Sequence, residues 1–175
     1  MRRLVEYFSP HPPVSRRRDH IVEGVGACFA VAFVTAVNFF GLRQFSVAVP
    51  LMAPIGASAV ILFCARHSPI GRAWNVVIGN VVSALVGVAC ATHLDSPEYA
   101  APAAMFLSIA AMVLTRALHP PGGAVALTAV IASGPVREAG YFFAFDPVLI
   151  SSLSLVAVAA GFHFLRDRFL PARGR

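Results

Sequence analysis

The chain has 175 residues, of which 58% are hydrophobic and only 13% are charged, whereas a soluble domain is about 45–50% apolar and about 25% charged. This composition excludes a disordered chain and a solvated repeat, and it argues against a soluble enzyme core. The formal net charge is +6, and every basic residue is Arg. A nucleic-acid partner is not expected, because the sequence has no basic face interleaved with aromatic residues.

Six stretches lack Asp, Glu, Lys and Arg and approach the length of about 20 residues that a helix needs to cross a membrane. In chain order they are Gly24–Leu42, Gln44–Ala65, Ala73–Thr92, Tyr99–Thr115, Ala117–Val136 and Pro147–Phe162. A soluble six-helix bundle would show polar faces at helical spacing, and these stretches show none. We therefore expect an all-α, polytopic membrane protein with six segments.

The placement of Arg predicts the orientation, because basic residues concentrate in short cytoplasmic segments. They gather in the N-terminal tail, the loop 66–72 and the C-terminal tail, whereas the loop 93–98 holds Asp95 and Glu98 without Arg. Six crossings place both termini and all Arg-rich segments in the cytoplasm. Four crossings, with two re-entrant segments, would put Arg66 and Arg72 on the wrong side.

These observations predict a cytoplasmic tail over residues 1–20, a transmembrane domain over 21–165 and a second cytoplasmic tail over 166–175. We expect the protein in the cytoplasmic (inner) membrane of a bacterium. The lipid bilayer is then its first partner, and a homo-oligomer is an open alternative to a monomer. The three Cys residues, none in a CxxC pair, are expected to be small buried hydrophobes rather than metal ligands or a disulfide framework.

The second and fifth stretches share a sequence pattern. Pro54-Ile55-Gly56-Ala57-Ser58-Ala59 aligns with Pro121-Gly122-Gly123-Ala124-Val125-Ala126 as P-x-G-A-x-A, and further on Asn75, Val77 and Ser83 align with Asp146, Val148 and Ser154. Each half then contains a plain span, a segment interrupted by Pro and Gly, and another plain span. Three crossings per half predict two inverted repeats, as in many transporters. The alternative is chance similarity between membrane helices, in which Gly and Pro are common.

An interrupted helix has a chemical consequence inside a membrane. Pro ends the preceding helix, and the following Gly residues allow other backbone segments to approach. The new helix begins with free N–H groups and the positive end of its dipole, which is a suitable place for an anion. Unsatisfied backbone is tolerated at that depth only where protein or a water-filled cavity covers it. We therefore expect a polar cavity between Gly56 and Gly123.

Polar residues accompany only the second interruption. His119 stands two residues before Pro121 and Arg116 five before it, whereas the corresponding residues of the first half, Met52 and Val49, are apolar. Arg can hold a planar oxyanion through a forked pair of donors, and His can donate or gain a proton near neutral pH. Two alternatives stay open: Arg116 as a snorkelling side chain at a cytoplasmic helix end, and His119 as a capping or core residue.

The stretch Thr115-Arg116-Ala117-Leu118-His119-Pro120-Pro121-Gly122-Gly123-Ala124 resembles the signature of the HPP family of integral membrane proteins. Residues 54–62 and 67–80 are also similar to that family, and the resemblance covers residues 20–165. It implies a compact membrane domain, often described as four-spanning, and an association of some plant and cyanobacterial members with nitrite transport. Many relatives carry His at the position of Asn80, so a proton pathway shared with them is in doubt.

The leading hypothesis is a transporter or channel for a small inorganic anion, with nitrite suggested by the resemblance. The predicted substrate-binding residues, where the two broken helices meet, are Arg116, His119, Pro120, Pro121, Gly122, Gly123, Pro54, Gly56, Ser58 and Asn80. The alternative is a non-transporting regulatory or scaffolding module whose breaks let helices pack closely. We expect no enzyme, cofactor or metal, because the sequence has no HExxH, no Ser-His-Asp order and no paired intramembrane carboxylates.

Overall fold

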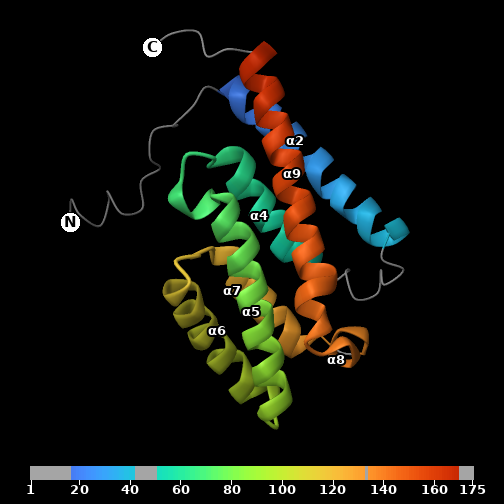
Figure 1. The fold of residues 1–175 in the computed structure, drawn as a ribbon, viewed down its shortest axis with the longest axis vertical. Helices are drawn as coiled ribbons and strands as arrows, with labels where there is room; N and C mark the ends of the chain where they lie inside the picture. The colour runs from blue at the N-terminus through green and yellow to red at the C-terminus, as the bar shows by residue number, and fades with distance from the viewer. Residues whose placement is uncertain (1–16, 42–50, 133, 170–175) are drawn as a thin grey trace, which may run out of the picture.

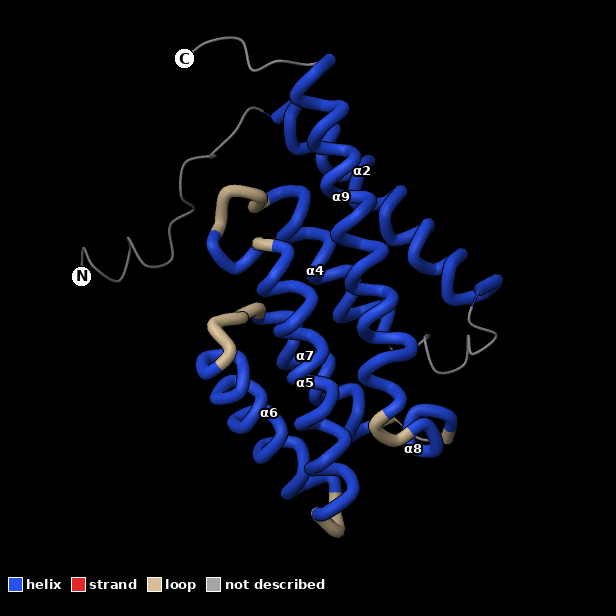
Figure 2. Tube along the Cα trace, in the orientation of Figure 1, coloured by secondary structure: helices blue, strands red, loops and turns tan. Residues whose placement is uncertain are grey.

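The computed structural model describes residues 17–41, 51–132 and 134–169. The described residues form helices and connecting turns without a strand (Figure 2), so the expected all-α class is confirmed. In chain order the elements are α2 (Arg17–Ala36), the π-helical turn η1 (Val37–Gly41), α4 (Met52–Cys64), the 3₁₀ turn η3 (Pro69–Gly71), α5 (Ala73–His93), α6 (Pro97–Leu114), α7 (Pro120–Ile131), α8 (Pro135–Ala139), the π-helical turn η4 (Ala144–Leu149) and α9 (Ile150–Phe169).

The six predicted segments correspond to four long helices and two short ones. Four helices are long and apolar enough to cross a membrane, namely Asp19–Phe40, Ala73–His93, Pro97–Leu114 and Ala144–Phe169. The two Pro- and Gly-containing segments, α4 and α7, have 13 and 12 residues. At about 1.5 Å per residue they measure about 20 and about 18 Å, so neither can cross a hydrocarbon core of about 30 Å by itself.

Two charge-free stretches are only partly helical in the described residues. Of Gln44–Ala65, the part before Leu51 lies outside the described residues, and α4 begins at Met52. Of Ala117–Val136, Pro120–Ile131 forms α7, and only Pro135 and Val136 are also helical, as the start of α8. The boundaries follow local chemistry, because prolines occupy the first turn of α7 and Gly134 adopts a left-handed φ of 62° beyond its end.

The helices form two groups of three. In one group α2 and α4 pack with α9, and in the other α6 and α7 pack with α5, while contacts of α4 with α7 and of α5 with α9 join the groups. Figure 1 shows α2 and α9 reaching the upper end of the molecule, with α5, α6 and α7 below them. The third helix of each half of the sequence therefore packs with the first two helices of the other half.

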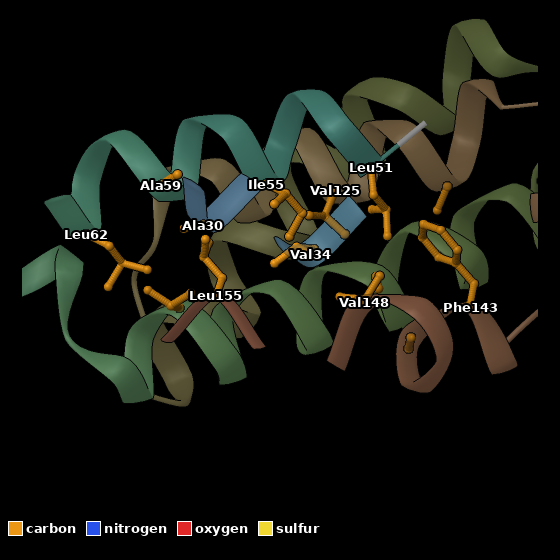
Figure 3. Packing of buried hydrophobic residues seen from close by; sticks show 14 of the residues in the cluster. Ala30, Val34, Leu51, Ile55, Ala59, Leu62, Val125, Phe143, Val148 and Leu155 are labelled. Atoms are coloured by element: carbon orange, nitrogen blue, oxygen red, sulfur yellow. The ribbon is translucent and has the colours of Figure 1, made fainter. Parts of the chain in front are cut away.

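The hydrophobic core lies where these helices meet. Val34, Ile55, Val125 and Leu155, from α2, α4, α7 and α9, are each at most 2% exposed and belong to one cluster (Figure 3). Large apolar side chains also point outward, since Phe106 on α6 is 71% exposed. Outward-facing apolar side chains are what helices in contact with lipid require. The prediction of buried cysteines is confirmed for Cys90 and is wrong for Cys28 and Cys64, which are exposed.

Ion pairs join the start of α2, the loop before α5 and the end of α9. Arg166 Nη1 lies 2.7 Å from Glu23 Oε1, and Arg66 Nη1 lies 3.0 Å from Asp167 Oδ1. We call this the arginine-rich end; the opposite end carries Asp95, in the loop between α5 and α6, and Glu98, in the first turn of α6. The structure therefore brings together the segments that the Arg distribution groups on one side. Residues 1–16 and 170–175 of the two tails lie outside the described residues.

Replacing Arg166 by Ala tests the pair at this end. Glu23 is only 6% exposed, so its carboxylate would lose its cation without regaining full hydration. We expect the free energy of unfolding to fall by about 3 kcal/mol, measured by thermal unfolding in detergent micelles. Arg168→Ala is the control, because the Arg168 side chain is exposed and has no hydrogen bond or ion pair with the described residues. Equal melting temperatures for the two variants would contradict this role.

Candidate functional site

The loop between α6 and α7 begins with a helix-terminating turn at Arg116. The Arg116 N–H donates to the Val113 carbonyl at 3.1 Å, and the Ala117 N–H donates to the Met112 carbonyl at 2.8 Å. This pair of bonds is the Schellman motif, in which Gly usually takes the left-handed position. Arg116 takes it here, with φ of 53°. A left-handed conformation costs a residue with a side chain about 1–2 kcal/mol.

The Arg116 side chain is exposed and forms no hydrogen bond or ion pair with the described residues. It lies next to the start of α5, where Trp74 Nε1 donates to the Thr115 carbonyl and Asn75 Nδ2 donates to the Leu118 carbonyl. A cation at the C-terminal end of a helix is favourable for the helix dipole. This position agrees with the alternative of an end-of-helix Arg that points toward solvent.

His119 turns inward instead. It is the N-terminal cap residue of α7, and its side chain is fully buried. Its Nδ1 lies 3.0 Å from the Ile70 carbonyl oxygen, so Nδ1 carries a proton and donates it. Its Nε2 lies 2.9 Å from Ser58 Oγ on α4, within hydrogen-bonding distance. His119 therefore links the start of α7 to α4 and to the loop before α5.

The start of α7 offers fewer donors than the sequence suggests. Pro120 and Pro121 occupy its first two positions and have no N–H. The Gly122 N–H donates to the His119 carbonyl at 2.8 Å, and the His119 N–H faces the Met112 sulfur at 3.4 Å. The expected row of free N–H groups is thus absent in this first turn of the described chain. The dipole of the helix remains, and Pro121, Gly122 and Gly123 are all buried around it.

Glycines bring α5 and α7 into backbone contact. A Cβ atom at Gly79 would lie 2.6 Å from the Ala117 carbonyl oxygen, and one at Gly87 would lie 2.5 Å from the Ala126 carbonyl oxygen. A Cβ atom at Gly122 would lie 2.8 Å from Ser83 Oγ. Only glycine permits such an approach, which is a common way for membrane helices to pack.

The expected cavity between Gly56 and Gly123 stays a prediction, because neither glycine lines either of the two described pockets. A Cβ atom at Gly56 would meet no atom within 4 Å, whereas one at Gly123 would lie 3.1 Å from the Met105 sulfur on α6. The two glycines therefore face different surroundings. The larger of the two described pockets, about 290 Å³, lies toward the opposite end and is lined by Val88 and Arg137 among others.

Two buried polar atoms next to the α5–α7 contact have no partner. They are Ser83 Oγ and Asn80 Oδ1, both on residues that are fully buried on α5. The other end of the Asn80 amide, Nδ2, donates to Ser152 Oγ on α9 at 3.1 Å. A buried hydroxyl without a partner costs about 1–3 kcal/mol, so it points to a polar species that binds there or to another conformation.

The structure brings together some of the predicted residues and separates others. His119, Ser58 and Pro54 are connected, because the Ser58 hydroxyl also lies 3.0 Å from the Pro54 carbonyl oxygen. Pro120 is exposed, as is Arg116, while Asn80 is buried beside Ser152. Sequence reasoning missed Ser83 and Asn75 as site residues. Both residues occur in the alignment of the two halves, and this alignment is the sequence feature that could have identified them.

Among the described residues, no three His, Cys, Asp or Glu side chains gather as a metal site would require. The site instead consists of hydroxyl and amide groups, one imidazole and the positive end of a helix. Such neutral donors suit a small anion or water better than a cation of the transition series. The absence of a metal or cofactor in the function stays a prediction.

Comparison with known proteins identifies a family. The family described as "HPP, transmembrane region" matches residues 12–171. Two Dictyostelium discoideum proteins, each named as a transmembrane protein, are 39% identical over 113 residues and 37% identical over 126 residues. These matches cover 62% and 69% of this chain but only 36% and 44% of the relatives, so the chain spans less than half of their length. No solved structure matches.

Adding a methyl group at the α5–α7 contact tests the close approach. Gly79→Ala or Gly87→Ala would push against a backbone carbonyl, which cannot move aside as a side chain can. We expect each to lower the free energy of unfolding by about 2 kcal/mol. Gly161→Ala on α9 is the control, because its Cβ meets nothing within 4 Å and Ala favours a helix by up to about 1 kcal/mol. Thermal unfolding in micelles measures all three.

A double-mutant cycle tests the bond between α4 and α7. Ser58→Ala and His119→Ala each remove one partner of the 2.9 Å contact, so their effects should not add. We expect a coupling energy of about 1 kcal/mol in denaturant unfolding. Ser108→Ala replaces Ser58→Ala in a control cycle, because the Ser108 hydroxyl donates within its own helix, to Met105. Equal coupling in both cycles would show that His119 and Ser58 do not interact.

Proposed function

The chain belongs to the HPP transmembrane family, and we propose that it moves a small inorganic anion across a membrane, with nitrite as the first candidate. The proposal rests on the start of α7, which lies against Gly79 and next to the unpartnered Ser83 hydroxyl. Gly79 is six residues after the start of α5, or about 9 Å along its axis. If α5 crosses the membrane, α7 begins inside it, with its positive end facing the arginine-rich end.

The proposed binding place is the space that opens between Ser83 and the start of α7. The Ser83 hydroxyl is free to donate, and Asn80 Oδ1 would accept a hydrogen bond from water that accompanies the anion. The dipole of α7 supplies positive potential without a full charge, so an anion would be held weakly enough to leave. His119, with both ring nitrogens engaged, acts in this proposal as a positioning residue and not as a direct ligand.

Arg116 acts in the proposal as an attractor of anions at the arginine-rich end. Its exposed guanidinium has no described partner to neutralise it, and a cationic entrance raises the local anion concentration. Its place beside the start of α7 supports this role over the forked oxyanion ligand that the sequence suggests. Arg116 can also affect stability through its left-handed backbone, and a substitution must distinguish this effect from the effect of its charge on flux.

We further propose that the two halves are inverted repeats with six segments and that both termini face the cytoplasm. The packing supports this, because the third helix of each half packs with the first two helices of the other half: α9 with α2 and α4, and α5 with α6 and α7. The order of one long, one short and one long helix in each half also supports it. The ion pairs that gather Glu23, Arg66 and Arg166 at one end agree with a cytoplasmic arginine-rich end. A bacterial inner membrane stays part of the proposal.

A second function has a specific observation in its favour. The backbone contacts at Gly79 and Gly87 close the α5–α7 contact, and neither of the two described pockets is lined by Gly79 or by the start of α7. A membrane module that serves regulation or scaffolding, without transport, would need no more than this packing. Neither proposal includes an enzymatic reaction. The bilayer is the expected partner in both, and the small anion only in the first.

Ser83→Ala distinguishes the two functions. In the packing alternative the variant only removes an unsatisfied buried hydroxyl, so stability rises and nothing else changes. In the transport proposal, nitrite flux into proteoliposomes falls about tenfold, because a hydrogen bond to a charged group is worth about 1.5–3 kcal/mol. Ser108→Ala is the matched control, a buried serine on α6 whose hydroxyl is bonded within its helix, and it should keep full flux.

The wild-type measurement tests the function itself. Flux should be measured for a panel of small anions, with and without a pH gradient, in vesicles of defined orientation. Absence of flux for every anion, with protein that is folded by its melting temperature, would favour the scaffolding alternative. Full flux in Ser83→Ala would be compatible with transport but would show that the anion does not bind at Ser83.

Replacing Arg116 separates its charge from its backbone. Arg116→Gly relieves the left-handed strain, so we expect the melting temperature to hold or rise while nitrite flux at low ionic strength falls severalfold. Arg116→Lys keeps the charge and should keep most of the flux. The difference should shrink at high salt, because exposed charges are screened. Equal flux of both variants at low salt would exclude an electrostatic role for Arg116.

A further inference from the structure

The opposite end of the molecule holds a pocket that the proposed transport site does not use. Its volume is about 290 Å³, and it lies between the end of α5, the end of α7 and the short α8. Val88, Ala129 and Val136 form apolar walls, and Thr92 and Arg137 supply the polar groups. Figure 1 shows α8 near the lower parts of α5 and α9, away from the arginine-rich end.

Arg137 is the cation of this pocket, and it lacks a counter-ion. Its side chain forms no hydrogen bond or ion pair with the described residues. Glu138 is the next residue in the sequence. Asp95 lines a smaller pocket of about 50 Å³ together with Arg137. Because neither carboxylate is paired with it, the guanidinium keeps its forked donors for a ligand.

The floor of the pocket is made by the α5–α7 contact. Val88 and Ala129 are 5% and 4% exposed, so the pocket reaches down to the hydrophobic core. Gly87, one residue before Val88, lies in backbone contact with Ala126. The pocket is therefore separated from Ser83 and the start of α7 by one layer of tightly packed small residues.

We propose that this pocket binds a small carboxylate with a short apolar body. A planar carboxylate fits the fork of Arg137, and an alkyl group of a few carbons would cover Val88, Ala129 and Val136. The volume equals that of about ten liquid waters at about 30 Å³ each, so a three-atom anion would leave most of the apolar wall bare. The site is distinct from the proposed nitrite site, and its occupation does not require that the protein transports anything.

A charge-selective labelling experiment tests the site without a transport assay. In a variant with all three cysteines replaced by Ala, Thr92→Cys places a thiol on the exposed wall of the pocket. Its modification rate is measured in detergent micelles with an anionic sulfonate and a cationic trimethylammonium methanethiosulfonate. The reference is Tyr99→Cys on α6, which is 75% exposed and does not line the pocket.

We expect the anionic reagent to react about fivefold faster than the cationic one at Thr92→Cys, relative to the reference, since the Arg137 charge lines the same pocket as the thiol. Arg137→Gln should abolish this preference, and Arg168→Gln at the other end should not. Butyrate should slow the modification in a saturable way, and nitrite should do so more weakly.

Three results would overturn the proposal. The first is a charge preference that Arg137→Gln leaves unchanged, and the second is protection by nitrite that equals protection by butyrate. The third is protection by added phosphatidylglycerol but not by butyrate, which would assign the pocket to a lipid headgroup. Because none of these readouts depends on flux, a failure here and a failure of the transport proposal are distinguishable.

Discussion

The backbone contact between α5 and α7 is the constraint on which the rest of the structure depends. Two apolar helices in lipid gain nothing from the hydrophobic effect when they meet, so they need close packing to stay together. Gly79 and Gly87 provide it, since a single methyl group at either would reach within 2.6 Å of a carbonyl oxygen. This contact holds α7, a helix too short to cross a membrane, at a fixed height beside a long one.

The position of α7 along α5 explains the sequence at the start of α7. A helix that begins inside a membrane exposes donors that water cannot satisfy. Two prolines remove two of these donors, and the Gly122 N–H is bonded to the His119 carbonyl. The His119 ring then ties the same turn to Ser58 and to the loop before α5. The His-Pro-Pro sequence thus leaves few unsatisfied N–H groups at the start of α7. An anion bound there would be held by the helix dipole and Ser83, not by free N–H groups.

The sequence predicted the helices more closely than the site. The charge-free stretch Ala73–Thr92 matches α5 almost residue for residue, because long apolar runs have few structural alternatives in a membrane. The sequence predicts that Arg116 and His119 act together, but Arg116 occupies the left-handed position of the turn and is exposed, whereas His119 is buried. The contact of Ser58 with His119 joins residues 61 positions apart, and no local pattern reports such a distance.

The two ends of the α5–α7 contact differ in what holds them. At the arginine-rich end, Trp74 and Asn75 donate to carbonyl groups of the loop before α7, so separation there would break hydrogen bonds. Along the contact itself, no side-chain hydrogen bond joins α5 to α7 within the described residues, and only van der Waals packing would be lost. Separation of α5 from α7 at the Arg137 end would therefore break fewer hydrogen bonds than separation at the His119 end. A separation of this kind would join the Arg137 pocket to the Ser83 hydroxyl, which has no partner while the contact is closed.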